Sequence, residues 1–68
     1  MNEEALNATV RKFLKKVGIT SQREIEMAVR DAVAAGRLKG NESFLAKATV
    51  QVEGLNLKFE IKGDIELE

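Results

Sequence analysis

The spacing of the apolar residues changes once along the chain, near Phe44, and this change limits the fold more than any other feature. Before Phe44 the apolar side chains recur every three or four positions, which is the period of one face of an α-helix. From Phe44 onward apolar and polar residues alternate, as in a strand with one buried face. The sequence therefore predicts an α+β protein with its helices first and an antiparallel sheet after them.

The helical part contains signals for two helices. The first is expected from about residue 3 to about residue 17, with Asn2 as its N-cap and Gly18 ending it in the left-handed conformation. The segment Ser21-Gln-Arg-Glu24 matches a capping box and predicts the start of a second helix, which would end near residue 35 before Gly36. The expected apolar stripes are Leu6, Val10, Phe13, Leu14 and Val17, then Ile25, Ala28, Val29, Ala32 and Val33.

The alternating part breaks at Glu53-Gly54, which predicts a β-hairpin with a two-residue turn at this dipeptide. The apolar residues on either side of the break, from Phe44 to Val52 and from Leu55 to Ile61, would share one face of the hairpin. This turn places Lys47 opposite Glu60, which is a favourable cross-strand pair. We favour this register.

A second register differs from the first by two residues. A turn at Gly54-Leu55 would suit type II′ geometry, because glycine would be its first loop residue. The shift keeps the same apolar face but sets Lys47 against Lys62, which is a repulsive pair.

The alternation continues beyond the predicted hairpin to Leu67. One interpretation, which we favour, is a long or bent second strand. The other is a turn at Lys62-Gly63-Asp64 that leads into a short third strand.

These elements predict a single domain over residues 1–68 with the order α-α-β-β. The helical hairpin would pack on one face of the small antiparallel sheet. Both edges of a two-stranded sheet are open, so strand pairing with a second copy would enlarge a core that is marginal at 68 residues.

Cysteine and histidine are both absent from the sequence. Their absence removes thiolate zinc sites and the side chain best suited to acid–base catalysis near neutral pH. The remaining nucleophile candidates are hydroxyl groups with lysine as their only base, and the glycines form no phosphate-binding loop. We expect no enzymatic activity, no catalytic residue, no metal-binding residue and no cofactor.

No stretch approaches the roughly 18 apolar residues of a membrane span, and the N-terminus lacks the apolar run of a secretory signal. A sequence without cysteine also fits a reducing compartment. We expect a folded cytoplasmic protein that does not engage a membrane.

The net charge of zero conceals an uneven distribution. Residues 1–40 carry eight basic and five acidic side chains, whereas residues 41–68 carry three basic and six acidic ones. Opposite charges of this kind can steer a partner or favour self-association. They can also be two solvated surfaces of different composition.

Five basic residues form the candidate binding surface: Arg11, Lys12, Lys15, Lys16 and Arg23. The first four make two i,i+4 rows on the side of the first helix away from its apolar stripe, where they could meet phosphates or an acidic protein. Followed by Gly18 and a second helix, they are also reminiscent of a helix-turn-helix. The register disfavours this motif, because Glu24 occupies the place where a recognition helix carries an apolar packing residue.

Four stretches, MNEEALN, RKFLKKVGITSQREIEMAVRDAV, GRLKGNE and EGLNL, carry a resemblance to a family of short bacterial proteins known only as a domain of unknown function. The resemblance covers nearly the whole chain and implies a complete small protein of bacterial, cytoplasmic origin. The family has no known activity, so the resemblance assigns no role to any residue.

The sequence thus favours a small non-enzymatic protein-interaction module, whose partner is another protein or a second copy in a homodimer. The alternative is a nucleic-acid-binding regulator that uses the five basic residues.

Overall fold

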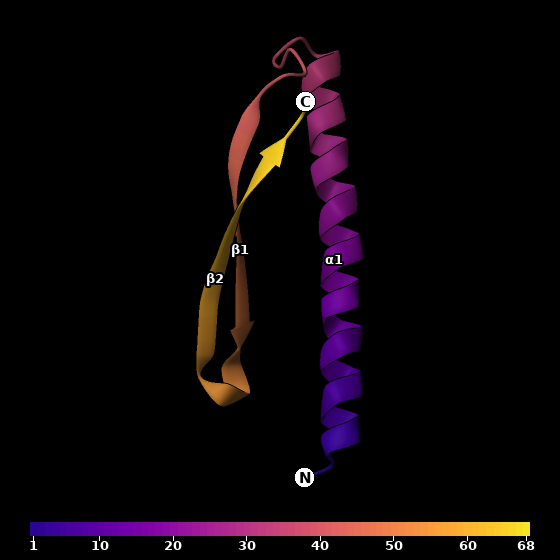
Figure 1. Cartoon of the computed structure of the whole chain (residues 1–68), viewed down its shortest axis with the longest axis vertical. Coiled ribbons are helices and arrows are strands. Elements are labelled where there is room, and N and C mark those ends of the chain that lie inside the picture. The colour runs from indigo at the N-terminus through magenta and orange to yellow at the C-terminus, as the bar shows by residue number, and fades with distance from the viewer. The chain divides into compact units, whose positions relative to one another are not determined.

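The computed structural model describes all of residues 1–68 and consists of one helix followed by one hairpin (Figure 1). The helix α1 spans Glu3–Ala34, and the strands β1 (Ser43–Val52) and β2 (Leu57–Glu66) are joined by the short 3-10 helix η1 (Glu53–Leu55). The chain divides into two units, Met1–Arg37 and Leu38–Glu68, which are described separately below. The α+β class is confirmed, whereas the single domain and the packing of helix on sheet stay predictions.

The start of α1 is fixed by Asn2, as predicted. Asn2 has an extended backbone, and its side-chain oxygen accepts a hydrogen bond of 3.1 Å from the Ala5 amide. This bond satisfies one of the amides that the first turn leaves without a partner. Glu3 and Glu4 follow in the first turn, where the helix dipole favours negative charge.

The predicted helical hairpin is wrong, because α1 continues through the expected turn as a single 32-residue helix. Gly18 lies inside the helix, and so does the segment from Ser21 to Glu24 that resembles a capping box. A glycine inside a helix costs only about 1 kcal/mol relative to alanine, which the surrounding turns can offset. The break in Figure 1 comes only at the end of the magenta ribbon, after the last turn of α1.

The two predicted apolar stripes join into one, which explains the continuous helix. Val17, Ser21 and Ile25 are spaced four residues apart, so the stripe crosses the polar Ser21 without changing face. Residues eleven apart are about three turns apart and share a face. We call the following set the α1 stripe: Leu6, Val10, Phe13, Leu14, Val17, Ile25, Ala28, Val29, Ala32 and Val33.

The end of α1 is the predicted glycine stop. Gly36 has a φ of 79°, and its amide donates to the Val33 carbonyl at 3.0 Å. The Arg37 amide donates to the Ala32 carbonyl at 2.9 Å. These two bonds form a Schellman motif, which needs a residue that tolerates positive φ at the position of Gly36.

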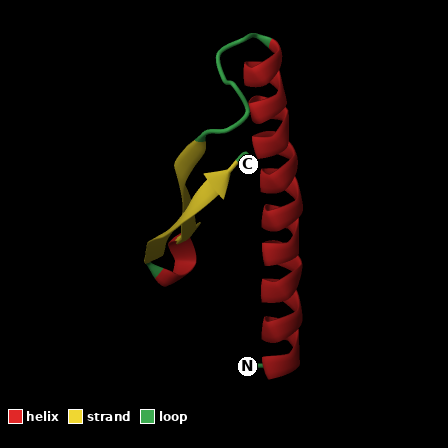
Figure 2. Cartoon of the chain, turned by 45° about the horizontal axis from the view of Figure 1, so that its top comes forward, coloured by secondary structure: helices red, strands yellow, loops and turns green.

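In the hairpin, β1 and β2 pair antiparallel in the register that differs from the favoured one by two residues. Val52 lies opposite Leu57, and Lys47 lies opposite Lys62 instead of Glu60. The favoured two-residue turn at Glu53-Gly54 is therefore wrong. Figure 2 shows the reason, a short red helical turn between the two yellow strands.

The tip of the hairpin selects this register. After η1, Asn56 adopts a φ of 51°, and its amide donates to the Glu53 carbonyl at 3.1 Å. Asparagine tolerates this left-handed conformation better than most residues, so a four-residue connection closes without strain. The Lys47–Lys62 repulsion is offset on the diagonal, because Lys47 Nζ lies 3.6 Å from Glu60 Oε1.

The division of the hairpin into an apolar and a polar face is the predicted one, since a shift of two residues preserves faces. The second strand continues to Glu66, with Ile65 opposite Phe44, so the long-strand interpretation is confirmed and there is no third strand. We call the following set the hairpin face: Phe44, Ala46, Ala48, Val50, Val52, Leu57, Phe59, Ile61, Gly63 and Ile65.

Candidate interaction surfaces

Within its own unit, the α1 stripe is not covered by other side chains. Leu6, Phe13 and Leu14 expose 47–50% of their surface, and only Val17, Val29 and Ala32 of the stripe are half-buried. The larger side chains lie in the first half of the stripe, whereas alanines alternate with branched residues in the second half. A helix with one apolar face of this kind gains most of its stability when that face is covered.

The hairpin face is exposed as well. Its large residues Phe59 and Ile61 expose 41% and 57% of their surface, and no side chain anywhere in the chain is buried. Gly63 and Ala46 lie opposite each other and make the face shallow at that point. A two-stranded hairpin needs its apolar face covered to be stable.

The five basic residues of the candidate binding surface lie on one helix rather than two. Lys12 and Arg23 are eleven residues apart and therefore share the side of α1 opposite the apolar stripe. Arg11 and Lys15 lie instead along one flank of the stripe. All five side chains are exposed. The two ion pairs in the chain join Arg30 to Glu26 and Lys47 to Glu60, so the five basic residues are unpaired within the chain. Their role in binding stays a prediction.

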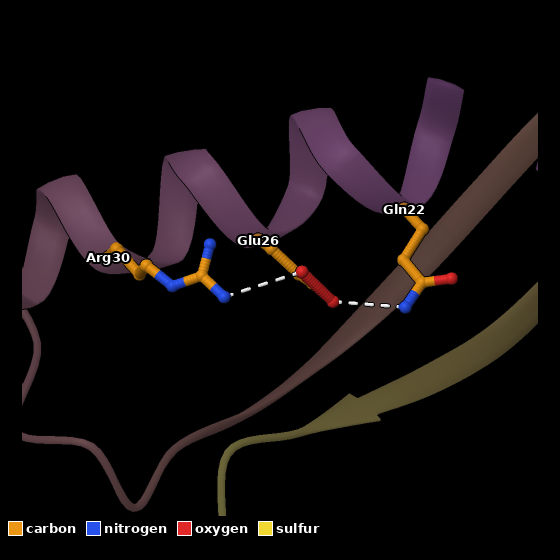
Figure 3. A network of polar contacts seen from close by, with 3 residues as sticks. All are labelled: Gln22, Glu26 and Arg30. Atoms are coloured by element: carbon orange, nitrogen blue, oxygen red, sulfur yellow. Dashed lines mark hydrogen bonds and ion pairs between the residues drawn. The ribbon is translucent and has the colours of Figure 1, made fainter. Parts of the chain in front are cut away.

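A small polar network lies along the flank of the α1 stripe (Figure 3). Glu26 accepts a hydrogen bond of 3.0 Å from Gln22 Nε2 and lies 3.4 Å from Arg30 Nη2. The three side chains come from successive turns of the helix, which is the favourable i,i+4 spacing. The network fixes the Glu26 carboxylate and leaves part of its acceptor capacity free for a further donor.

The connection before β1 is organised by Glu42, which the sequence analysis did not single out. The Glu42 carboxylate accepts hydrogen bonds from the amides of Lys39 and Gly40 at 2.9 Å each and of Asn41 at 3.2 Å. The hydrogen bonds from the Lys39 and Gly40 amides lower the pKa of Glu42 below its ordinary value. Gly40, with a φ of 105°, lets three consecutive amides converge on the carboxylate.

Two shallow, open hollows lie on α1, and the second is lined by Phe13, Lys16, Val17, Thr20 and Ser21. Four of these residues follow the spacing i, i+3, i+4 and i+7, which forms the hole that receives a side chain of a facing helix in a coiled coil. No group of three or more acidic, histidine or cysteine side chains gathers to hold a metal ion. No helix combines the length and apolar content needed to cross a membrane.

Comparison with known proteins gives one match. The sequence model of a family of unknown function, DUF6494, matches residues 1–68, the whole chain. No curated protein and no solved structure matches. Nucleic-acid binding is not supported by these comparisons, and the helix-turn-helix interpretation fails because α1 has no turn near Gly18.

Proposed function

Because the chain belongs to DUF6494, a family of unknown function, its role must be argued from its surfaces, and we propose that it is a non-enzymatic protein-interaction module that acts as a homodimer. One observation carries the proposal: each unit has a continuous apolar face, and no side chain is buried. Extended apolar surface on a folded chain is a mark of interaction sites.

The extent of each apolar face supports an association of ordinary size. The α1 stripe has ten residues along a 32-residue helix, and the hairpin face has ten residues on two paired strands. A stable interface removes about 800 Å² from each partner.

The charges of the two units permit a second copy as the partner. Residues 1–37 carry seven basic and five acidic side chains, and residues 38–68 carry four basic and six acidic ones. The two net charges cancel, so two copies of the chain do not repel each other as two copies of a strongly charged chain would.

Non-enzymatic function is part of the same proposal. It is supported by the absence of cysteine and histidine, and by the position of Ser21 inside α1, where its hydroxyl has no basic partner. We place the protein in the bacterial cytoplasm, on the basis of its cysteine-free sequence and the family resemblance of its motifs.

Sedimentation equilibrium of the full chain from micromolar to millimolar concentration tests the homodimer. The expected result is a mass approaching twice 7.5 kDa that persists at high salt, because apolar burial is not screened by ions. A monomer at every concentration would contradict the homodimer, and a dimer that dissociates completely with added salt would contradict the apolar interface.

A further inference from the structure

We infer that α1 pairs with α1 of a second copy in an antiparallel arrangement, apolar stripe against apolar stripe, with the two-fold axis near Gly18. The inference rests on the proposed homodimer and specifies which element forms it and in which direction. Since α1 spans Glu3–Ala34, Gly18 is at its midpoint. An axis there places the first half of one helix beside the second half of the other.

Side-chain size favours the antiparallel direction. In this arrangement Leu6 lies between Ala28 and Ala32 of the second copy, because Leu6 and the midpoint of these two alanines are both twelve residues from Gly18. Val10 likewise lies between Ile25 and Ala28 of the second copy. Near the ends of the stripe a large residue then faces small ones, which lets the two surfaces interdigitate there. A parallel pair would set large against large in one half and leave alanine facing alanine in the other.

The charges that flank the stripe favour the same direction. Antiparallel pairing places Arg11 beside Glu26 of the second copy, and Lys15 beside Gln22. Glu26 is already held at the edge of the stripe by Gln22 and Arg30 (Figure 3). Parallel pairing in register would instead place Arg11 and Glu26 of the second copy fifteen residues apart along the axis, so this attraction would be lost.

Gly18 provides an independent observation at the midpoint. A Cβ added to Gly18 would meet nothing within 4 Å, so nothing in the chain itself requires glycine there. Glycine is also the poorest helix former after proline. A close approach of a second backbone explains its presence, because glycine leaves the most room between two crossing helices.

Cysteine cross-linking of the full chain tests the direction, because the chain has no cysteine of its own. Gly18→Cys is expected to form a covalent dimer under mild oxidation, since the two copies of residue 18 meet at the axis. Val10→Cys and Ala28→Cys are each expected to give no covalent dimer alone but to cross-link to each other when mixed. The two single variants are matched controls, and circular dichroism checks that each remains helical.

The outcomes separate this inference from the proposed function. Covalent dimers of Val10→Cys alone and of Ala28→Cys alone would indicate parallel helices and overturn the inference. A dimer by sedimentation without any cross-link through α1 would also overturn it, because the hairpin face would then form the interface, while the homodimer would stand. A monomer by sedimentation would overturn both.

A charge exchange provides a second test that needs no oxidation. Arg11→Glu and Glu26→Arg are each expected to raise the dimer Kd by roughly tenfold, since two pairs per dimer become repulsive. The double variant restores the attraction and is expected to return the Kd to within roughly threefold of the original. Additive weakening in the double variant would contradict the pairing of these two positions.

Discussion

The helix α1 and the β1–β2 hairpin each have one apolar face, but different interactions fix their local structure. The hydrogen bonds of α1 close within the helix, and its ends are set by Asn2 and Gly36. The hairpin depends on pairing between two strands, and the conformation of Asn56 at its tip sets that pairing for every residue. A helix therefore tolerates one unfavourable residue such as Gly18, whereas one turn residue moves a whole strand by two positions.

The comparison also predicts which region depends more on being covered. A helix of 32 residues retains part of its structure through local hydrogen bonds, whereas an isolated two-stranded hairpin is marginal in water. Substitutions on the hairpin face should therefore have larger effects than equivalent substitutions on the α1 stripe.

The largest effect is expected for Ile61→Asp. Ile61 lies in the hairpin face opposite Ala48, and the sequence predicts that this face is covered by packing, which a carboxylate there would oppose. We expect a loss of roughly 3 kcal/mol or more in stability, measured by chemical unfolding. Leu45→Asp is the matched control, because Leu45 is 71% exposed and lies on the polar face. Equal losses for the two variants would mean that the hairpin face is not covered.

The next effect concerns the α1 stripe. Leu14 and Ile19 are each 50% exposed but lie on different sides of α1, with only Leu14 in the stripe. Leu14→Ala is expected to weaken dimerisation by about 2 kcal/mol, or roughly thirtyfold in Kd, because two side chains per dimer lose apolar burial. Ile19→Ala should leave the Kd unchanged, as sedimentation velocity would show. An equal response of both variants would exclude the stripe as the interface.

These predictions rest on features that the sequence reveals to different degrees. The capping roles of Asn2 and Gly36 were predictable, because a cap acts within a few residues of itself. The position of Gly18 inside the helix was not predictable, because the sequence around a glycine after basic residues is the same whether the helix ends there or continues. The deciding signal was the continuity of the stripe from Val17 through Ser21 to Ile25, a relation between two segments.

The hairpin shows the same limit at the strand level. Its faces follow from alternation alone, whereas its register depends on which loop residue adopts positive φ. The Lys47–Glu60 attraction favours one register in the sequence, but the structure keeps that ion pair on a diagonal in the other register. The left-handed tendency of Asn56 was the overlooked signal.

Among the candidate surfaces, the basic side of α1 was predictable from its period, but the role of Glu42 was not. Glu42 acts through amides of its own loop, and their convergence depends on the backbone of Gly40. The only sequence signal for the role of Glu42 is Gly40, two residues before it.

A smaller, local effect is expected at the end of α1. Gly36→Ala should destabilise the chain by about 1 kcal/mol, because alanine at a φ of 79° is strained. Gly36→Asn should cost less, since asparagine tolerates this conformation. Thermal unfolding by circular dichroism compares the three proteins, and an alanine variant as stable as the original would contradict the Schellman stop.

The smallest effect is a pH dependence from Glu42. Its pKa is lowered in the folded chain by the amides of Lys39 and Gly40, so its contribution to stability is present above the unfolded pKa and lost as pH falls through the folded pKa. Glu42→Gln should remove this component of acid destabilisation. Amide chemical shifts of residues 39–41, followed by NMR during acid titration, should report the same transition. Amide chemical shifts that do not change as Glu42 is protonated would contradict the hydrogen bonds between its carboxylate and these amides.

The central claim is that a second copy covers the α1 stripe, and isotope-filtered NMR on an equal mixture of labelled and unlabelled chains tests it most directly. Intermolecular contacts are expected from the Leu6 methyl groups to the methyl groups of Ala28 and Ala32. Contacts from Leu6 that are exclusively intramolecular, in a sample shown to be dimeric by sedimentation, would contradict it.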